Sequence, residues 1–430
     1  MRKTQLIIAL AAVGFAGSAM ATNGYFAHGY GTASKGMGGA GIAYPQDSLA
    51  AATNPAGMVH VGNRIDFGLE VFVPDRGFSL GDGAVMDFTG VPPGSPSVIT
   101  PVPAASYDGN GSGAMESWFP IPEFGYNRMI NPNMSLGVSV YGNGGMNTTY
   151  ADGDHPFAGG SGATVGIDLM QMFIAPTVAY KVNDQFSVGA SVNFVVAAFK
   201  SEGLEALGQA SNGRDLSYGA SLHLGAMFKP SDSVTLGVTY QSKANMSKFD
   251  DYNVLFPNDG EFDIPATYGV GVAFKASDKL DIAFDVSRIE FGEVGVTGNN
   301  PDNFFVGAPH GFGWENQTVY KLGVSYKYSD DLTLRAGYNY AKNPVDVNSS
   351  VAGLAFNTLA PGVVEKHITL GFTKKLDAES SVSGYYVHAF ENEVDGTFMA
   401  PTSTKNVFFV APGTLKMSQD AFGLSYNKKF

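Results

Sequence analysis

Most of the chain alternates between apolar and polar side chains with a period of two residues. From Asn63 onward one unit repeats: an alternating strand, a short polar turn, a second alternating strand and a longer loop. Because successive side chains of a strand point to opposite faces, this rhythm predicts strands with one apolar face. In the first strand the apolar face is formed by Ile65, Phe67, Leu69, Val71 and Val73, and the polar face by Arg64, Asp66, Gly68 and Glu70.

The short polar turns divide the chain into hairpins. They lie at 131–133, 183–184, 230–232, 277–278, 329–331 and 377–379. Counting gives about fourteen strands of roughly 9–11 residues or slightly more, the length that a tilted membrane strand needs. A soluble β-sandwich also has alternating strands, but the strand lengths and the short and long loops favour a barrel.

We therefore predict an all-β protein in which residues 63–430 form a transmembrane antiparallel β-barrel of about 14 strands. The even number places both chain ends on one side, which we expect to be periplasmic. The connections 74–118, 143–167 and 291–316 would then be extracellular loops. The terminal Phe430 is typical of the signal read by barrel-assembly machinery, and we expect a monomer among outer-membrane lipid and lipopolysaccharide.

The first residues predict export. Arg2 and Lys3 precede an apolar run at 6–15, and a small-x-small site ends at Ala21. This is the pattern of a cleavable signal peptide over 1–21. The apolar run is too short to span a bilayer as a helix.

Composition agrees with a barrel in the outer membrane. The chain has 55 Gly, 31 Phe and 20 Tyr but 0 Cys, and its mean hydropathy is near zero. An exported, cysteine-free chain with these residues and alternating segments is typical of outer-membrane barrels. The net charge of -13 argues against nucleic acid as a partner, since phosphate binding needs a basic face.

Residues 22–62 do not follow the hairpin rhythm. They are rich in Gly and Ala and contain the turn-forming triplet Asn54, Pro55 and Ala56 shortly before the first strand. A wide barrel needs something in its lumen unless it is an open channel. We therefore predict an N-terminal hatch, or plug, over 22–62.

These features resemble the outer-membrane long-chain fatty-acid transporter family, which includes toluene and xylene uptake homologues. The matching residues are Asn54-Pro55-Ala56, preceded by 38–43 and by Asp47-Ser48. The resemblance implies passive transport of hydrophobic compounds, with long-chain fatty acids the expected substrate and aromatic hydrocarbons or alkanes open. It implies capture at extracellular loops, transfer to an interior pocket and release past the hatch. It also places the mature N-terminus in that pocket, which would be lined by Thr22, Asn23, Gly24, Tyr25 and Phe26.

The long loops are unusually apolar for exposed segments, which predicts a groove that captures hydrophobic ligands. The candidate residues are Phe78, Phe88, Met115, Trp118 and Phe119. The alternation also places three cations in the lumen, namely Arg64, Lys321 and Arg335. A cation could meet a substrate carboxylate there, but anions are at least as numerous and favour a self-paired lumen. The glycine-containing stretch 187–190 would permit a strand kink.

Other functions are less well supported. A general diffusion porin would have an open lumen, whereas this chain carries about forty residues before its first strand. An outer-membrane hydrolase or adhesin is a third possibility. The motif Gly36-x-Gly38-x-x-Gly41 lacks the preceding strand of a dinucleotide fingerprint. The 7 His are scattered, and the loop from Asp108 has Phe119 where a calcium loop needs glutamate. We therefore predict no catalytic residue, metal or cofactor.

Overall fold

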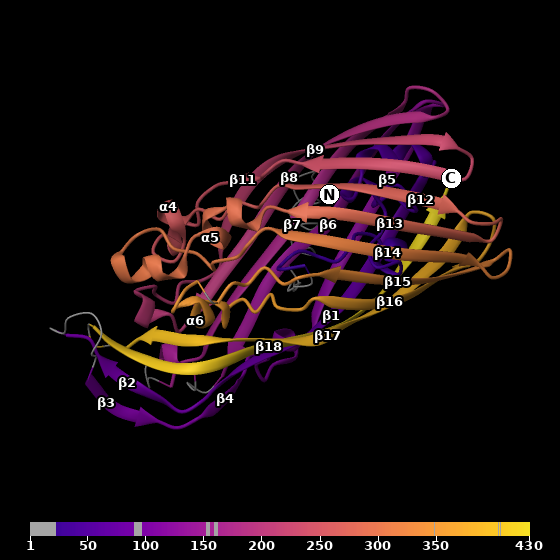
Figure 1. The fold of residues 1–430 in the computed structure, drawn as a ribbon. Coiled ribbons are helices and arrows are strands. Elements are labelled where there is room, and N and C mark those ends of the chain that lie inside the picture. Colours follow the sequence, from indigo (N-terminus) through magenta and orange to yellow (C-terminus); the bar gives the residue numbers. More distant parts are fainter. Residues whose placement is uncertain are drawn as a thin grey trace.

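The alternating segments form long antiparallel strands that pair in chain order and close into a ring (Figure 1). The computed structural model describes residues 23–89, 97–151, 155–158, 162–347, 349–402, 404 and 406–430. The predicted signal peptide and Thr22 lie outside this part of the chain. The ring closes where β1 pairs with β18, from Arg64 opposite Lys429 to Leu80 opposite Gly413.

Fourteen strands build the wall, which confirms the predicted number and arrangement. They are β1 (Arg64–Leu80), β5 (Phe119–Asn131), β6 (Met134–Tyr150), β7 (Val165–Lys181), β8 (Phe186–Glu202), β9 (Asp215–Ser231), β10 (Val234–Gln241), β12 (Thr267–Lys275), β13 (Leu280–Ile289), β14 (Gln317–Lys327), β15 (Leu332–Ala341), β16 (Lys366–Lys375), β17 (Ser380–Pro401) and β18 (Val407–Lys429).

The other elements are short and lie in the connections or before the first strand. The strands are β2 (Gly83–Asp87), β3 (Ser97–Val102), β4 (Ala105–Asp108) and β11 (Asn245–Met246). The α-helices are α2 (Thr32–Lys35), α3 (Ala114–Ser117), α4 (Pro257–Gly260), α5 (Gly295–Gly298) and α6 (Gly353–Asn357). The 3-10 helices are η1 (Ala50–Ala52), η2 (Pro55–His60), η3 (Pro156–Ala158), η4 (Glu205–Leu207), η5 (Asp250–Tyr252), η6 (Phe291–Glu293) and η7 (Pro301–Val306). None of the helices described here has the length and apolarity of a transmembrane helix.

The two faces of the wall follow the sequence rhythm. In β1, Phe67 and Leu69 are half exposed on the outside, whereas Asp66 and Glu70 are buried inside the ring. The short turns lie at one end of the barrel and the long connections at the other (Figure 1). The amide of Phe430 donates to the carbonyl of Asn63 at 3.3 Å, so the end of the chain and the start of the wall lie at the short-turn end.

Several strands are longer than the alternation predicts. β1, β6, β7, β8 and β9 each contain 17 residues, and β5 contains 13. The last two strands are longer still, with 22 residues in β17 and 23 in β18. The expected loops 74–118 and 143–167 are therefore partly strand. The reason is visible in β7, where every residue of 165–173 is buried. Once both faces of a strand are covered, its period of two disappears from the sequence.

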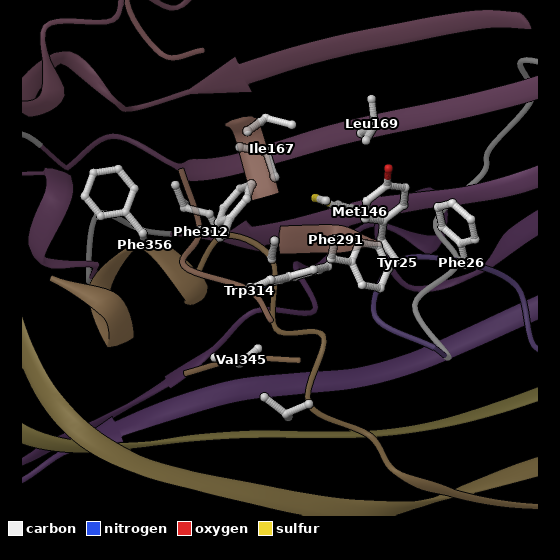
Figure 2. Close-up of a cluster of buried hydrophobic side chains, with 14 of the residues drawn as sticks. Tyr25, Phe26, Met146, Ile167, Leu169, Phe291, Phe312, Trp314, Val345 and Phe356 are labelled. Carbon is white, nitrogen blue, oxygen red and sulfur yellow. The ribbon is translucent and has the colours of Figure 1, made fainter. Parts of the chain in front are cut away.

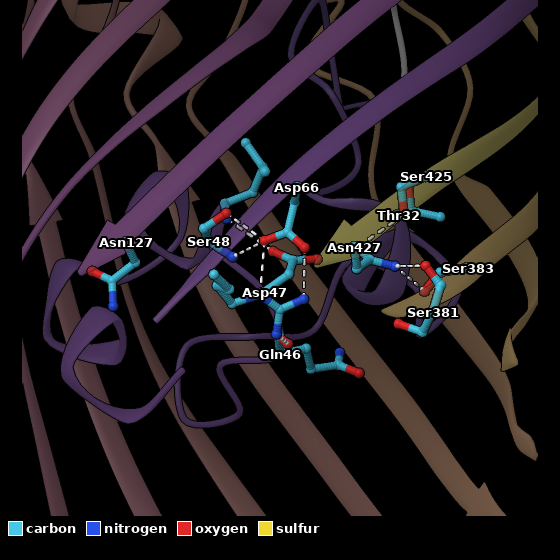
Figure 3. A network of polar contacts seen from close by, with 12 residues as sticks. Thr32, Gln46, Asp47, Ser48, Asp66, Asn127, Ser381, Ser383, Ser425 and Asn427 are labelled. Atoms are coloured by element: carbon cyan, nitrogen blue, oxygen red, sulfur yellow. Dashed lines mark hydrogen bonds and ion pairs between the residues drawn. The ribbon is translucent and has the colours of Figure 1, made fainter. Parts of the chain in front are cut away.

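The N-terminal segment 23–62 lies inside the ring, held by inward-facing side chains from widely separated strands. The carboxylate of Asp285 accepts hydrogen bonds from the amides of Gly41 at 2.7 Å and Ile42 at 3.0 Å. Asp66 accepts the amide of Ser48 at 2.9 Å (Figure 3). The wall thus satisfies backbone donors that an irregular buried segment would otherwise leave unpaired.

The glycines of β8 and β9 allow this segment to approach the wall. A Cβ on Gly189 would lie 2.3 Å from the carbonyl carbon of Pro55, and one on Gly225 would lie 1.9 Å from Oδ1 of Asn54. The stretch 187–190 pairs in regular register with both neighbouring strands. The freedom of 187–190 to kink is thus not used in its pairing, and Gly189 instead gives room to the N-terminal segment.

Candidate functional site

Two aromatic residues of the N-terminal segment join the long connections in one buried cluster (Figure 2). The ring of Tyr25 lies 5.3 Å from that of Phe291 and 6.0 Å from that of Trp314, and Phe26 lies 5.5 Å from Phe291. Gly24 has a φ of 60°, and a Cβ there would lie 2.7 Å from the Phe291 ring. Only glycine therefore lets the chain turn so close to this ring.

The cluster continues toward the outer ends of the long connections. Phe312 lies 5.9 Å from Trp314, ring centre to ring centre, and lines a small apolar cavity beyond it. The other aromatic residues around this cavity are Phe199, Phe256, Phe262 and Phe356. An apolar path thus extends from the long connections to Tyr25. Sequence reasoning missed these residues, because only the folded chain brings the connections 242–266, 290–316 and 342–365 together.

A second small cavity lies directly against Tyr25. It is lined by Tyr25, Phe72, Met146, Trp314 and Met417 among others, and its volume is about 20 Å³. A space of that size can hold a water molecule but not an acyl chain. Any larger ligand must therefore displace side chains of the N-terminal segment.

The N-terminal segment is hydrogen-bonded to a bulge in β6. The register of β6 against β7 shifts between Gly142 and Gly144. At this bulge the amide of Gly145 donates to the carbonyl of Tyr25 at 3.0 Å, and the amide of Ala27 donates to the carbonyl of Asn143 at 2.9 Å. A Cβ on Gly144 would lie 2.0 Å from the Tyr25 carbonyl oxygen, so this contact requires glycine.

The wall is incomplete beside the bulge. β5 pairs with β6 only from Phe124 opposite Val140 to Asn131 opposite Met134. The outer part of β5, from Phe119 to Glu123, pairs with β1 alone among the described strands. A cavity of about 380 Å³ lies at this level, lined by Phe119 of β5, Asn147 of β6, Met170 of β7 and several charged residues such as Lys200 and Arg214. We call this interruption of the ladder the β5–β6 gap.

The predicted hatch motif lies against β8 and β9. The Asn54 amide donates to the carbonyls of Ile42 at 2.7 Å and Ala226 at 3.3 Å, and its Oδ1 accepts the amide of Ala56 at 3.1 Å. Asn54 thereby caps η2, which Pro55 begins. One side chain thus connects the segment to itself and to the wall.

Comparison with known proteins places this architecture in a family. The family model described as outer membrane protein transport protein (OMPP1/FadL/TodX) matches residues 8–353. The chain belongs to this family. Members reside in the outer membrane, and so does this chain. A search of curated proteins finds no significant match.

Solved structures with the same fold agree with the OMPP1/FadL/TodX assignment. A Pseudomonas aeruginosa FadL homologue superposes with a TM-score of 0.67 at 20% identity, covering 95% of this chain and 100% of its own. The P. putida toluene transporter TodX superposes with a TM-score of 0.65 at 20% identity, covering 94% of this chain and 99% of its own. The Ralstonia pickettii toluene transporter TbuX superposes with a TM-score of 0.61 at 17% identity, covering 94% of this chain and 99% of its own. At these identities the likeness concerns the fold.

Within this OMPP1/FadL/TodX barrel, the predicted pocket residues that are described lie together. Asn23, Tyr25 and Phe26 are buried at the centre of the aromatic cluster, whereas Thr22 lies outside the described chain. The three predicted lumen cations differ in their partners. Arg64 forms an ion pair with Asp66 at 2.7 Å. Lys321 and Arg335 do not form such a pair within the described part of the chain.

Arg335 and Lys321 form no ion pair with a described residue. Arg335 donates to Oε1 of Gln46 at 2.8 Å and to the Thr373 hydroxyl at 2.7 Å. Lys321 borders a cavity of about 80 Å³ together with Phe26 and Tyr30. Of the predicted cations, Lys321 is therefore the one that lines a cavity beside the N-terminal aromatics.

The predicted capture residues do not meet in one groove. Phe78 and Phe119 are buried, and Phe88 is partly exposed near Phe408. Trp118 is 52% exposed and its ring lies 6.3 Å from that of the outward-facing Phe422, so it faces the outside of the wall. The side chain of Met115 lies outside the described part of the structure. A capture role for these residues stays a prediction.

Sequence reasoning also missed a buried ion cluster between the N-terminal segment and the wall. The Lys35 ammonium lies 2.5 Å from Glu70 and 3.5 Å from Glu123, and the Tyr385 hydroxyl donates to Glu70. Burial alone would lower the pKa of Lys35, but the two carboxylates raise it above its usual value. Nothing in the sequence around Lys35 indicates a buried cation.

A second titratable group of the segment has a shifted pKa. Asp47 is buried near Asp66, Arg64 and Glu123, and its carboxylate accepts the amide of Leu49 at 2.9 Å (Figure 3). Burial, together with the charge of Asp66, raises the pKa of Asp47 to about 7. The protonation of this carboxyl group therefore changes near neutral pH.

Proposed function

We propose that the protein transports hydrophobic compounds passively across the outer membrane and that long-chain fatty acids are its substrate. One observation carries the proposal: the apolar path from the long connections ends at Tyr25 and Phe26, beside the β5–β6 gap. A hydrophobic solute gains about 0.8 kcal/mol for each CH₂ group that it buries. Such a path therefore suits a molecule that the lipopolysaccharide leaflet resists.

The route that we propose has three steps. The long connections face outward and capture the ligand, the N-terminal aromatics receive it, and it leaves past the segment 22–62, which acts as a hatch. Displacing Tyr25 and Phe26 creates the room that the small cavities lack. The β5–β6 gap gives the ligand a sideways exit toward the bilayer. Both chain ends are then periplasmic, and no energy source is required.

Lys321 supports an acid as the substrate rather than a neutral hydrocarbon. Lys321 lines the cavity beside Phe26, and its ammonium group has no described carboxylate partner within ion-pair distance. A substrate carboxylate could supply that charge, whereas toluene could not. Two of the three structures compared, TodX and TbuX, are toluene transporters, so the choice between the two classes has to be measured.

The substrate class can be tested on the purified protein. Mass spectrometry of lipid extracted from the preparation, together with competition between a radiolabelled C16 acid and toluene, measures which class binds. We expect the acid to be found and to resist displacement by toluene. Growth of a deletion strain on each compound checks uptake in the cell. Tight binding of toluene without binding of the acid would overturn the fatty-acid assignment.

A porin remains distinguishable by conductance in planar bilayers. If residues 23–62 fill the lumen as a hatch, the full chain conducts small ions poorly and a chain lacking residues 22–60 conducts well. Free conductance by the full chain would contradict the transporter and favour a diffusion pore.

A further inference from the structure

Arg76 of β1 occupies an unusual place for a buried cation. Its side chain is among the most completely buried in the described chain, and no described carboxylate lies within ion-pair distance of it. The guanidinium donates to the carbonyls of Asn147 at 2.6 Å and Glu116 at 2.9 Å, and to Oδ1 of Asn147 at 2.5 Å. Further bonds reach the Pro74 carbonyl at 3.3 Å and Oδ1 of Asn110 at 3.4 Å. Every one of these acceptors is uncharged.

These hydrogen bonds cross the β5–β6 gap at its outer edge. Arg76 belongs to β1, Asn147 to β6, and Glu116 to the short helix that leads into β5. From Phe119 to Glu123, the residues of β5 that precede Phe124, no backbone ladder joins β5 to β6 among the described residues. The Arg76 bridge, defined as the contacts of Arg76 with Asn147 and Glu116, thus connects the two sides at the outer edge of the gap. Backbone contact with β6 resumes beside it, where the Thr149 amide donates to the Gly109 carbonyl at 2.9 Å.

The bridge also separates two cavities. Arg76 borders the small cavity against Tyr25 and Trp314. Glu116 borders the cavity of about 380 Å³ at the gap, and Asn147 borders both. A ligand that moves from the Tyr25 cavity to the larger one must therefore pass the Arg76 bridge.

An uncharged set of acceptors makes this bridge responsive to an anion. A carboxylate binds a guanidinium through two parallel charge-assisted hydrogen bonds, which are about twice as strong as bonds to neutral acceptors. A carboxylate that enters the Tyr25 cavity would compete with Asn147 and Glu116 for the same donors. The cation lies over the Phe119 ring, 5.7 Å from its centre, so it can remain in place while its partners change.

We infer, on the basis of the proposed transport of acids, that Arg76 gates the β5–β6 gap. The carboxylate of the ligand opens the gap by replacing Asn147 and Glu116 as the partner of Arg76. A neutral hydrophobic molecule of the same length can displace Tyr25 and Phe26 in the same way, but it does not break the bridge. Arg76 thus selects for anionic amphiphiles at the exit, in addition to any selection at the pocket.

Distance measurements across the gap test this gate. The chain contains 0 Cys, so a Pro122→Cys, Thr149→Cys protein carries spin labels only at β5 and β6. Electron–electron double resonance in lipid nanodiscs then reports the width of the gap with palmitic acid, with methyl palmitate and without ligand. We expect the acid to shift the distance distribution to longer values and the ester to leave it unchanged. Arg76→Met should remove the difference between acid and ester, whereas Arg128→Met, at an exposed site of β5, should keep it.

Uptake into the same nanodiscs or into cells gives the second readout. We expect an acid-to-ester uptake ratio about tenfold lower for Arg76→Met than for the parent chain, the size of one charge-assisted bond. If Arg76→Met fails to assemble, as judged by heat-modifiable gel mobility, Asn147→Ala replaces it and should widen the ligand-free distribution. An unchanged distribution for Asn147→Ala, or an acid response in Arg76→Met equal to that of the parent, would overturn the gate.

The two proposals fail in different ways. A parent chain that neither binds nor takes up palmitic acid refutes the proposed function. A parent chain that takes up the acid while acid and ester give the same distance distribution refutes the gate and leaves transport intact.

Discussion

The carbonyl of Tyr25 accepts a hydrogen bond from the amide of Gly145 at 3.0 Å. Through this bond the N-terminal segment occupies the bulge of β6, next to the interruption between β5 and β6. Tyr25 and the strand that borders the gap are therefore in direct contact. If Tyr25 is displaced by a ligand as proposed, β6 loses a backbone bond, and binding would then be coupled to the shape of the wall.

Gly144→Ala should release the N-terminal segment from the bulge. Its new Cβ would lie 2.0 Å from the Tyr25 carbonyl oxygen, closer than any non-bonded contact allows. We expect hydrogen exchange at Ala27 and Gly145 to accelerate about tenfold or more, since each loses a bond worth about 1–1.5 kcal/mol. Gly213→Ala is the matched control, because a Cβ there meets nothing within 4 Å. Unchanged protection in Gly144→Ala would show that the contact is not required.

Lys35→Met should strongly destabilise the barrel together with its N-terminal segment. The substitution leaves Glu70 and Glu123 buried without their cation, and removing one partner of a buried ion cluster typically costs about 3–5 kcal/mol. Lys200→Met provides the comparison, because its ion pair with Glu202 is exposed and should contribute at most about 1 kcal/mol. The temperature of the heat-modifiable mobility shift measures both. If the mobility shift occurs at the same temperature in both variants, the ion cluster of Lys35, Glu70 and Glu123 does not stabilise the barrel.

The alternation of side chains predicted the wall because lipid contacts every second residue of each membrane strand. The same reasoning failed where both faces of a strand are covered by protein, as in 165–173. The aromatic path could not be predicted either. Phe312 and Phe356 lie in different connections and meet one cavity only because the ring brings those connections together. Arg76 appears in the sequence as an ordinary charged residue near the expected start of a loop, with no sign of its uncharged partners.

The stability of the segment around Asp47 should depend on pH. The pKa of this carboxyl is about 7 in the folded chain and 3.8 ordinarily, so folding favours the protonated form. The stabilisation is complete below about pH 4 and is lost as the pH rises toward 7. The facing groups are Asp66, Glu123 and Arg64. We expect hydrogen exchange over 47–52, corrected for its intrinsic pH dependence, to accelerate between pH 5 and 8.

Asp47→Asn separates this carboxyl from other titrating groups. The amide cannot ionise, so the pH dependence of exchange over 47–52 should become flat, whereas Asp184→Asn, in an exposed turn, should retain it. A slope that persists in Asp47→Asn would assign the effect to another group.

Asn54 and Gly225 should show coupled effects on the stability of the N-terminal segment. Asn54→Ala removes the cap of η2 and two bonds to carbonyls, and loss of such a cap alone costs about 0.5–2 kcal/mol. Gly225→Ala introduces a Cβ that would lie 1.9 Å from Oδ1 of Asn54, so it should be destabilising by itself. In the double variant that oxygen is absent and the clash with it disappears. We therefore expect the double variant to lose less stability than the sum of the losses in the two single variants. A double-mutant cycle on the hydrogen-exchange protection of residues 54–60 measures this difference. Strict additivity would mean that Asn54 and Gly225 act independently. The close approach of Asn54 to β9 would then not determine how the N-terminal segment is held in the barrel.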